Sequence, residues 1–201
     1  MIIQFASTMR KLRRDESGVT VIEFGFVAPV LCLLLMGMFD LGFQAYAQTN
    51  LSGAMQEAAR KSALEPTVIT TNQLDAEVTE AIQAVVPSAQ VSFERKNYQT
   101  FDDIDKPEDF TDNNGNGICD NNEPFEDLNG NLNWDQDRGR NGLGGARDAV
   151  LYTASASFDR VFPLYGFIDI PSTATISAST VLRNQPYDEQ TDRQPVVGYC
   201  T

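Results

Sequence analysis

The stretch that decides the fold is RDESGVTVIEFGFVAPVLCLLLMGMF, residues 14–39. Residues 19–39 of this stretch contain a single charged side chain, Glu23. At about 1.5 Å per residue a helix of this length runs about 31 Å, which matches a hydrocarbon core of roughly 30 Å. The sequence therefore predicts a transmembrane helix, and Pro29 need not end it within a membrane.

Charge on either side of the span predicts its orientation. A basic cluster precedes it, at Arg10, Lys11, Arg13 and Arg14, and Asp40 follows it. This asymmetry favours a cytoplasmic N-terminus with the rest of the chain outside. The competing interpretation is a secretory signal peptide cleaved near Ala45-Tyr46-Ala47. Against it, the apolar run exceeds the about 7 to 15 residues typical of such peptides and contains a carboxylate.

Glu23 needs an explanation, because a carboxylate within lipid costs roughly 2.5 to 3.5 kcal/mol. One interpretation is a protonated side chain near the cytoplasmic edge of the membrane. The other depends on Gly18, five residues earlier. Residues 18–24 resemble the type IV prepilin processing site, which implies cleavage between Gly18 and Val19. The new α-amino group would lie four residues from Glu23, and the ammonium and carboxylate would neutralise each other in lipid.

The run G-V-T-V-I-E-F behind a basic leader resembles the type IV prepilin processing site. Together with FDLG at 39–42 and AARKSA at 58–63, it resembles the TadE-like family of the tight-adherence (Flp) pilus system, and TadG-like relatives share this opening. The resemblance implies a pseudopilin or minor pilin of the bacterial inner membrane, cleaved by prepilin peptidase after Gly18. Glu23 and Phe24 would then serve assembly with other pseudopilins and pilus-assembly proteins.

Beyond the membrane the periodicity predicts an α+β domain. A helical stripe comprises Ala47, Leu51, Ala54, Met55 and Ala58. It indicates packing on the protein's own outer domain, or bundling with other subunits. A second helix is expected from an N-cap at Asn72 to Pro87, and strands at 89–98, 149–158 and 173–182. The fold class is thus a long membrane helix followed by a small pilin-like domain of helices on an antiparallel sheet.

The apolar stretch VFPLYGFIDIP, residues 161–171, is too short to cross a bilayer. It is interpreted first as core or as a turn that covers the sheet. The alternative is a patch that faces lipid or a partner.

The expected organisation has six parts. They are a leader (1–18), the transmembrane helix (19–39), a helix extension (40–64), the α+β domain (65–101 and 148–185), an Asp/Asn/Gly-rich insertion (102–147) and a polar tail (186–201).

The insertion concentrates the negative charge of the chain. Residues 102–137 contain twelve acidic side chains and one basic one, within a protein of net charge −13. Such a segment repels itself unless a cation neutralises it.

Residues 112–123, DNNGNGICDNNE, fit the twelve-residue calcium-loop template D-x-[DN]-x-[DN]-G-x5-E. The expected ligands are Asp112, Asn114, Asn116, the Ile118 carbonyl, Asp120 and Glu123, with Gly117 at the turn. A weaker copy begins fifteen residues later, with Asp127, Asn129, Asn131, Asn133 and Asp135 in matching places. In that copy Leu132 replaces the glycine and Arg138 replaces the closing glutamate, so the missing carboxylate is expected from Asp137.

Pro107 and Pro124 argue against the flanking helices of an EF-hand. The arrangement instead resembles the calcium loops of dockerins and thrombospondin type 3 repeats. The alternative is a solvated insertion that fits the template by composition alone. A disulfide between Cys119 and Cys200 would tie the tail to this segment in an oxidising compartment, and two free thiols are the alternative. Cys32 is interpreted as an apolar filler in the membrane.

Composition argues against other functions. The acidic surface disfavours nucleic acid, and the absence of histidine removes the commonest general base, so neither an enzyme nor a small-molecule substrate is expected. A metal-dependent hydrolase would need a nucleophile–base pair that the sequence does not offer. The expected function is structural, as a calcium-binding pseudopilin of the inner membrane with its C-terminal domain in the periplasm or outside the cell. A membrane-anchored, calcium-dependent adhesion module is the alternative.

Overall fold

A computed structural model describes residues 17–64, 71–184 and 193–201. The chain divides into two compact units. Among the described residues, the membrane unit contains 17–43 and 160–172, and the outer unit contains 44–64, 71–159, 173–184 and 193–201. Residues 1–16 of the expected leader lie outside the described residues.

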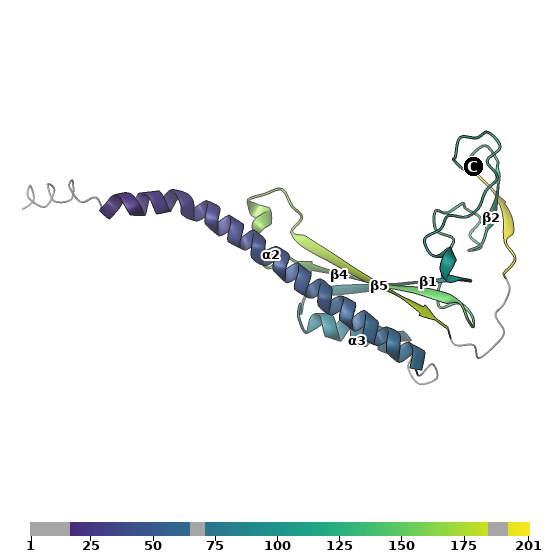
Figure 1. The fold of residues 1–201 in the computed structure, drawn as a ribbon, viewed down its shortest axis with the longest axis horizontal. Coiled ribbons are helices and arrows are strands. Elements are labelled where there is room, and N and C mark those ends of the chain that lie inside the picture. The colour runs from purple at the N-terminus through teal and green to yellow at the C-terminus, as the bar shows by residue number, and fades with distance from the viewer. Residues whose placement is uncertain (1–16, 65–70, 185–192) are drawn as a thin grey trace, which may run out of the picture. The chain divides into compact units, whose positions relative to one another are not determined.

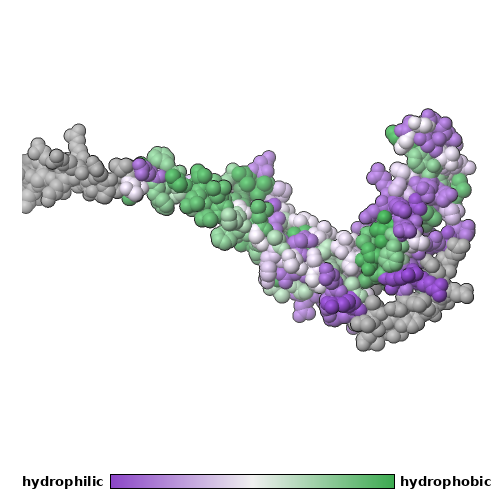
Figure 2. Space-filling model, viewed as in Figure 1, coloured by the Kyte–Doolittle hydropathy of each residue, from purple (hydrophilic) through white to green (hydrophobic). Residues whose placement is uncertain are grey.

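Helix α2 runs from Ser17 to Leu64 and contains Pro29 without a break. The expected membrane span and its extension are therefore one helix (Figure 1). Among the described residues it is the single helix long and apolar enough to cross a membrane. Figure 2 shows hydrophobic surface along its N-terminal half, where the side chains from Val21 to Leu35 are mostly exposed. Exposed apolar side chains over such a length are stable only in lipid or against other helices.

The second half of α2 packs inside the outer unit. Its predicted stripe is buried at Ala47, Leu51, Met55 and Ala58, which confirms packing on the protein's own domain. Helix α3, Thr71–Gln83, buries Leu74, Val78 and Ile82 at helical spacing. The prediction that Asn72 caps this helix is wrong, because the helix already includes Thr71 and so places Asn72 inside its first turn.

The main sheet has the strand order β3-β1-β4-β5 and is antiparallel throughout. Its strands are β1 (Gln90–Tyr98), β3 (Arg140–Asn141), β4 (Ala149–Asp159) and β5 (Thr173–Arg183). On β4 alternate residues from Val150 to Phe158 are buried, whereas Leu151, Thr153, Ser155 and Ser157 on the other face are half-buried. The sheet therefore has one apolar face and one polar face, and the α+β prediction is confirmed.

A second sheet was not predicted. Strand β2, Pro124–Asp127, lies within the expected insertion and pairs antiparallel with β6, Val196–Tyr199. The last residues of the expected tail, 186–201, thus include a strand, whereas residues 185–192 lie outside the described residues. A four-residue strand without regular alternation carries too little periodicity to be found from sequence.

The apolar stretch 161–171 connects β4 to β5 and contains a short 3-10 helix, η2, at Leu164–Gly166. Leu164 is buried, but Val161, Tyr165, Phe167 and Ile168 are exposed. The interpretation of this stretch as core, or as a turn covering the sheet, is therefore wrong. These apolar side chains face outward.

Candidate functional site

Two acidic loops stand at equivalent places in a fifteen-residue repeat. We define the first acidic loop as residues 112–120 and the second as residues 127–135. The Asp112 carboxylate accepts hydrogen bonds from the backbone N–H groups of Gly115 (2.6 Å) and Gly117 (2.9 Å). These backbone donors, Gly117 first, hold the pKa of Asp112 below its usual value. The first aspartate thus fixes the turn of its loop.

Asp127 does the same in the second loop. Its carboxylate accepts the N–H groups of Gly130 (2.6 Å) and Leu132 (2.8 Å). Leu132 occupies the position of Gly117, and both residues have positive φ, 64° and 74°. A leucine in this left-handed conformation is strained, because its Cβ approaches the neighbouring carbonyl. The loop geometry is therefore kept in the weaker copy despite the unfavourable residue.

The third, fifth and ninth positions of each loop converge. In the first loop the amide groups of Asn114 and Asn116 both donate to the Asp120 carboxylate, at 3.0 Å each. In the second loop the corresponding donors to Asp135 are Asn129 at 2.7 Å and Asn131 at 2.6 Å. The side chains that the calcium template assigns to positions 3, 5 and 9 thus meet at one point in both copies.

Each loop is closed by a buried glutamate from the other copy of the repeat. Glu123 is 1% exposed and accepts the N–H groups of Asn113 (2.7 Å) and Asp120 (3.3 Å). Glu108 is equally buried and accepts the N–H groups of Leu128 (2.9 Å) and Asp135 (3.2 Å). Leu128 and Asp135 follow Asn113 and Asp120 by fifteen residues, and Glu123 follows Glu108 by the same number. The two closures therefore use equivalent groups, with the two glutamates exchanged between the repeats.

In this structure Glu108, and not the Asp137 expected from the sequence, closes the second loop. The Asp137 carboxylate is instead engaged by Lys96 Nζ (2.8 Å) and the Tyr98 hydroxyl (2.9 Å). The signal for Glu108 was present in the sequence. The pattern E-x-F-x-D-x-N-x-N occurs at 108–116 and again at 123–131, so the repeat begins four residues before each loop.

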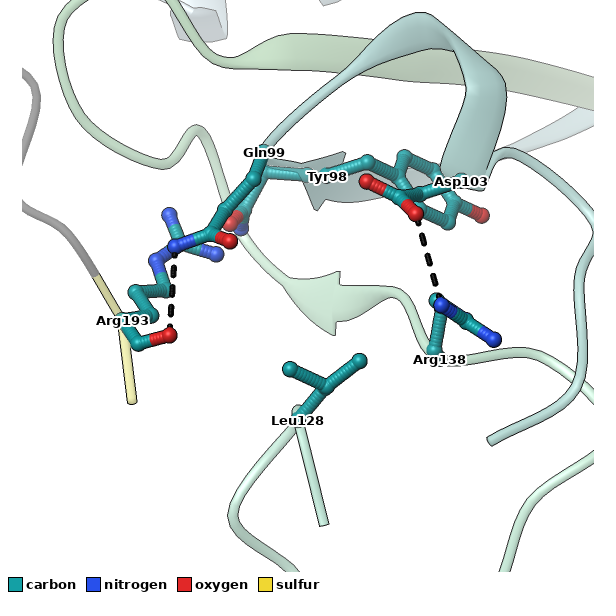
Figure 3. A pocket seen from close by; sticks show the side chains of 7 residues that line it. Tyr98, Gln99, Asp103, Leu128, Arg138 and Arg193 are labelled. Carbon is teal, nitrogen blue, oxygen red and sulfur yellow. Dashed lines mark hydrogen bonds and ion pairs between the residues drawn. The ribbon is translucent and has the colours of Figure 1, made fainter. Parts of the chain in front are cut away.

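Arg138, which occupies the closing position of the calcium template, points away from the second loop. Its guanidinium donates to the Pro107 carbonyl and pairs with Asp109 at 3.0 Å. It also pairs with Asp103 at 3.4 Å, beside a small pocket at the end of β1 (Figure 3). On the other side of that pocket Gln99 donates to the Arg193 carbonyl. Arg138 therefore links the two ends of the acidic segment.

Aromatic residues form a small core under the two loops. Phe110 and Phe125 hold the same position in the two repeats and pair in an isolated antiparallel bridge. Phe110 meets Trp134 edge to face, with ring centroids 5.7 Å apart, and the Trp134 indole donates to the Glu108 carbonyl at 2.8 Å. Phe125 packs so close to Gly198 that a Cβ there would lie 2.3 Å from its ring. The Trp134 indole thereby anchors the backbone at Glu108.

The C-terminal strand is joined to the first loop. Cys119 and Cys200 form a disulfide, with their Cα atoms 5.5 Å apart and a sequence separation of 81. The Cys200 N–H also donates to the Glu123 carbonyl at 2.9 Å, and the Asn122 N–H donates to the Cys200 carbonyl. Cys32, by contrast, is a free and exposed cysteine on α2.

The charges of the loops favour a cation. Burial raises the pKa of Glu108, backbone N–H donors oppose that shift, and the charge of Asp127 adds to it. Within residues 17–64, 71–184 and 193–201, no three acidic or cysteine side chains gather as a ready-made metal site. Backbone and amide N–H groups instead donate to the carboxylates of both loops. The residues suit a hard cation by composition, because the side chains that converge carry carboxylate or amide oxygen atoms.

The expected processing residues lie at the start of α2. Gly18 and Val19 have helical backbone, and Glu23 and Phe24 follow in the next turn with exposed side chains. Neither residue belongs to the buried part of α2, which begins near Asp40. The membrane unit thus leaves Glu23 accessible to lipid or to another chain.

Comparison with known proteins identifies the amino-terminal segment. Residues 18–60 match the model of the family described as TadE-like protein, which confirms the resemblance over α2. Among curated proteins and solved structures, none matches this chain. The match, together with the long apolar helix α2, indicates a membrane-anchored component associated with the tight-adherence pilus system.

Proposed function

We propose that this protein is a pseudopilin-like structural component of a tight-adherence (Flp, type IVb) pilus assembly system. Prepilin peptidase would cleave it after Gly18, leaving α2 as its single anchor in the inner membrane. The observation that carries the proposal is the TadE-like match over residues 18–60, which contains the expected processing residues Gly18 and Glu23 in the required order.

The exposure of Glu23 supports an assembly role. An ionised carboxylate that faces lipid is unstable without a counter-ion. Cleavage before Val19 would supply one as a new α-amino group, either from the same chain or from a neighbouring subunit. The outer unit would then lie in the periplasm or outside the cell, where the disulfide between Cys119 and Cys200 is compatible with the oxidising environment.

Two measurements test this role. Intact mass of the protein from its native membrane should correspond to a chain that begins at Val19, and a chain that retains its leader would contradict processing. Glu23→Gln keeps the size of the side chain but removes its charge, so it should insert into the membrane normally and fail to join the pilus assembly. Glu57→Gln, an exposed acid further along α2, is the matched control. Normal piliation of the Glu23 variant would contradict the assembly role.

We further propose that the two acidic loops bind Ca²⁺. The ligands would come from Asp112, Asn114, Asn116 and Asp120 with Glu123 in the first loop, and from Asp127, Asn129, Asn131 and Asp135 with Glu108 in the second. Bound calcium would neutralise the negative charge of these two buried glutamates, and so would stabilise the outer unit. Extracytoplasmic modules bind calcium at about 0.1 to 1 mM, which is the range expected here.

Calorimetry of the full chain in nanodiscs tests calcium binding directly. Titration should show saturable heat at millimolar calcium, and the melting temperature should rise with calcium concentration because the ligand binds the folded state. The double variant Asp112→Asn/Asp127→Asn should lose both effects. If the melting temperature of the unmodified protein does not change with calcium, the proposal is refuted. The acidic segment would then be a solvated insertion that binds no calcium.

A further inference from the structure

We infer that the connection between β4 and β5, residues 160–172, lies in the lipid–water interface and contacts acyl chains with its apolar side chains. We call these residues the interface loop. The inference goes beyond the pilus role and rests only on the part of the proposed function that places α2 in a membrane. The occupant of the exposed apolar surface is thus the bilayer itself, in the leaflet at the Phe39 end of α2.

The interface loop exposes more apolar surface than a water-facing turn does. The exposed fractions are 57% for Val161, 47% for Tyr165, 66% for Phe167 and 52% for Ile168. Asp169 is the one charged side chain among residues 161–171. Contiguous exposed apolar side chains mark an interaction surface. Aromatic residues beside a membrane span are typical of the interfacial layer.

The interface loop touches α2 where the apolar span ends. The ring of Phe162 stacks on that of Phe39, with centroids 6.1 Å apart and an interplanar angle of 28°. Phe39 is the last residue of the apolar run that begins at Val19. Twenty residues of helix rise about 30 Å, so Phe39 lies about one hydrocarbon thickness from Val19. Figure 1 draws the loop, in light green, beside α2. The contact therefore places the loop at the boundary of the hydrocarbon.

An ion pair fixes the loop at this level. The Arg160 guanidinium pairs with the Asp40 carboxylate, and their side chains are only 14% and 4% exposed. Arg160 Nε also donates to the Pro171 carbonyl and its backbone N–H donates to the Ser172 carbonyl, both at 2.9 Å. A single arginine thus holds both ends of the loop to the helix. Because both charges are buried and paired, they tolerate a poorly hydrated position.

The backbone of the loop satisfies many of its own hydrogen bonds. The Leu164 carbonyl accepts the N–H groups of Phe167 (2.9 Å) and Ile168 (3.0 Å), and the Ile168 carbonyl accepts that of Ile170 (2.9 Å). Internal bonding of this kind is needed in any segment that leaves water, because acyl chains offer no hydrogen-bond partners. The outward-pointing apolar side chains can then enter the bilayer without stranding peptide groups.

Continuity with α2 favours lipid over a protein partner. Leu34 and Met38, in the turns before Phe39, are 66% and 70% exposed, so the lipid-facing surface of the helix leads directly to the loop. With one carboxylate and no cationic side chain among residues 161–171, the loop has no group that would select anionic lipids. Contact with zwitterionic bilayers is therefore expected to suffice.

Tryptophan quenching in nanodiscs tests the inference on the full chain. Phe167→Trp places a reporter on the loop, Leu34→Trp places one on the membrane span and Val197→Trp places one on an exposed site of β6. Each is measured in phosphatidylcholine nanodiscs with ordinary or brominated acyl chains, after subtraction of the unmodified protein's emission. We expect brominated lipid to quench Phe167→Trp less than Leu34→Trp and clearly more than Val197→Trp.

The controls separate the possible failures. Quenching of Leu34→Trp alone would overturn the interface loop while leaving the membrane span intact, and would assign the apolar patch to a protein partner. Failure to quench Leu34→Trp would overturn both. Adding Arg160→Gln to Phe167→Trp should reduce quenching, because the loop would lose its link to Asp40. Unchanged quenching in that variant would contradict the positioning by the ion pair and with it the fixed depth of the loop.

Discussion

Replacement of Glu108 by glutamine tests the cross-closure of the two acidic loops. The Glu108 carboxylate accepts N–H groups of Leu128, Asn129 and Asp135 at 2.9, 3.4 and 3.2 Å. A glutamine in the same place keeps one oxygen for Leu128 and Asn129, and it turns its NH2 group toward the Asp135 N–H. One buried donor then loses its acceptor, which costs about 1 to 3 kcal/mol.

Part of that cost is offset without calcium. Burial raises the pKa of Glu108, so its charged form is itself disfavoured in the folded protein, and glutamine removes that penalty. We therefore expect the free energy of unfolding without calcium to fall by about 1 to 2 kcal/mol. With calcium the loss should be larger, because the variant no longer supplies a negative charge. A deficit of roughly 1.5 to 3 kcal/mol corresponds to about 10- to 100-fold weaker binding in the second loop.

The assay combines denaturant unfolding with calcium calorimetry on the full chain in nanodiscs. Glu126→Gln is the matched control, since it removes the same charge from an exposed position between the loops. Glu108→Gln should lower both stability and calcium affinity, whereas Glu126→Gln should change each only slightly. Equal behaviour of the two variants would refute the cross-closure. Loss of calcium affinity in Asp137→Asn but not in Glu108→Gln would restore Asp137 as the ligand.

Three further outcomes are expected. Cys200→Ser should lower the free energy of unfolding by roughly 4 kcal/mol, because the unfolded chain gains entropy over the sequence separation of 81. The control, Cys32→Ser, should leave the denaturant midpoint unchanged. Equal midpoints for the two variants would show that the disulfide is dispensable. Leu132→Gly should raise the melting temperature slightly. Relief of the strain at positive φ is worth about 1 to 2 kcal/mol, which exceeds the roughly 0.5 to 1 kcal/mol entropic cost of glycine. A lower melting temperature would contradict this. Burial alone would raise the pKa of Asp137, but hydrogen bonds, led by that from Lys96, lower it overall. The stabilising contribution of Asp137 is therefore present above about pH 4 and lost as the pH falls through the lowered folded-state pKa. Unfolding of Asp137→Asn should accordingly depend less on pH in that acid range, which titrated thermal scans would detect.

Helix positions and long strands were predictable because they depend on local pattern. The apolar run at 19–39 defines a membrane helix by itself, since its length and composition are properties of consecutive residues. The stripe at Ala47, Leu51 and Met55 and the alternation on β4 likewise indicated which faces are buried, and the structure buries them. The turn at Gly117 in the first acidic loop was also predictable, because its template lies within twelve consecutive residues, whereas calcium binding there stays a prediction.

Partners distant in the chain were decided only by the tertiary structure. Glu108 closes a loop that begins nineteen residues later. The linear template placed Arg138 at the closing position, so the sequence led to the expectation that Asp137 supplies the carboxylate. β6 pairs with β2 across some seventy residues, a choice that four residues of weak pattern cannot encode.

The sequence by itself determined that residues 19–39 form an apolar helix and that residues 102–137 carry most of the negative charge, because both features depend only on the composition of consecutive residues. Only the tertiary structure decided where residues 161–171 lie. Their composition suits a core equally well, and it is the pairing of Arg160 with Asp40, 120 residues apart, that turns them outward beside the helix. Contacts between residues so far apart depend on the closure of the whole fold, which no local window of sequence contains.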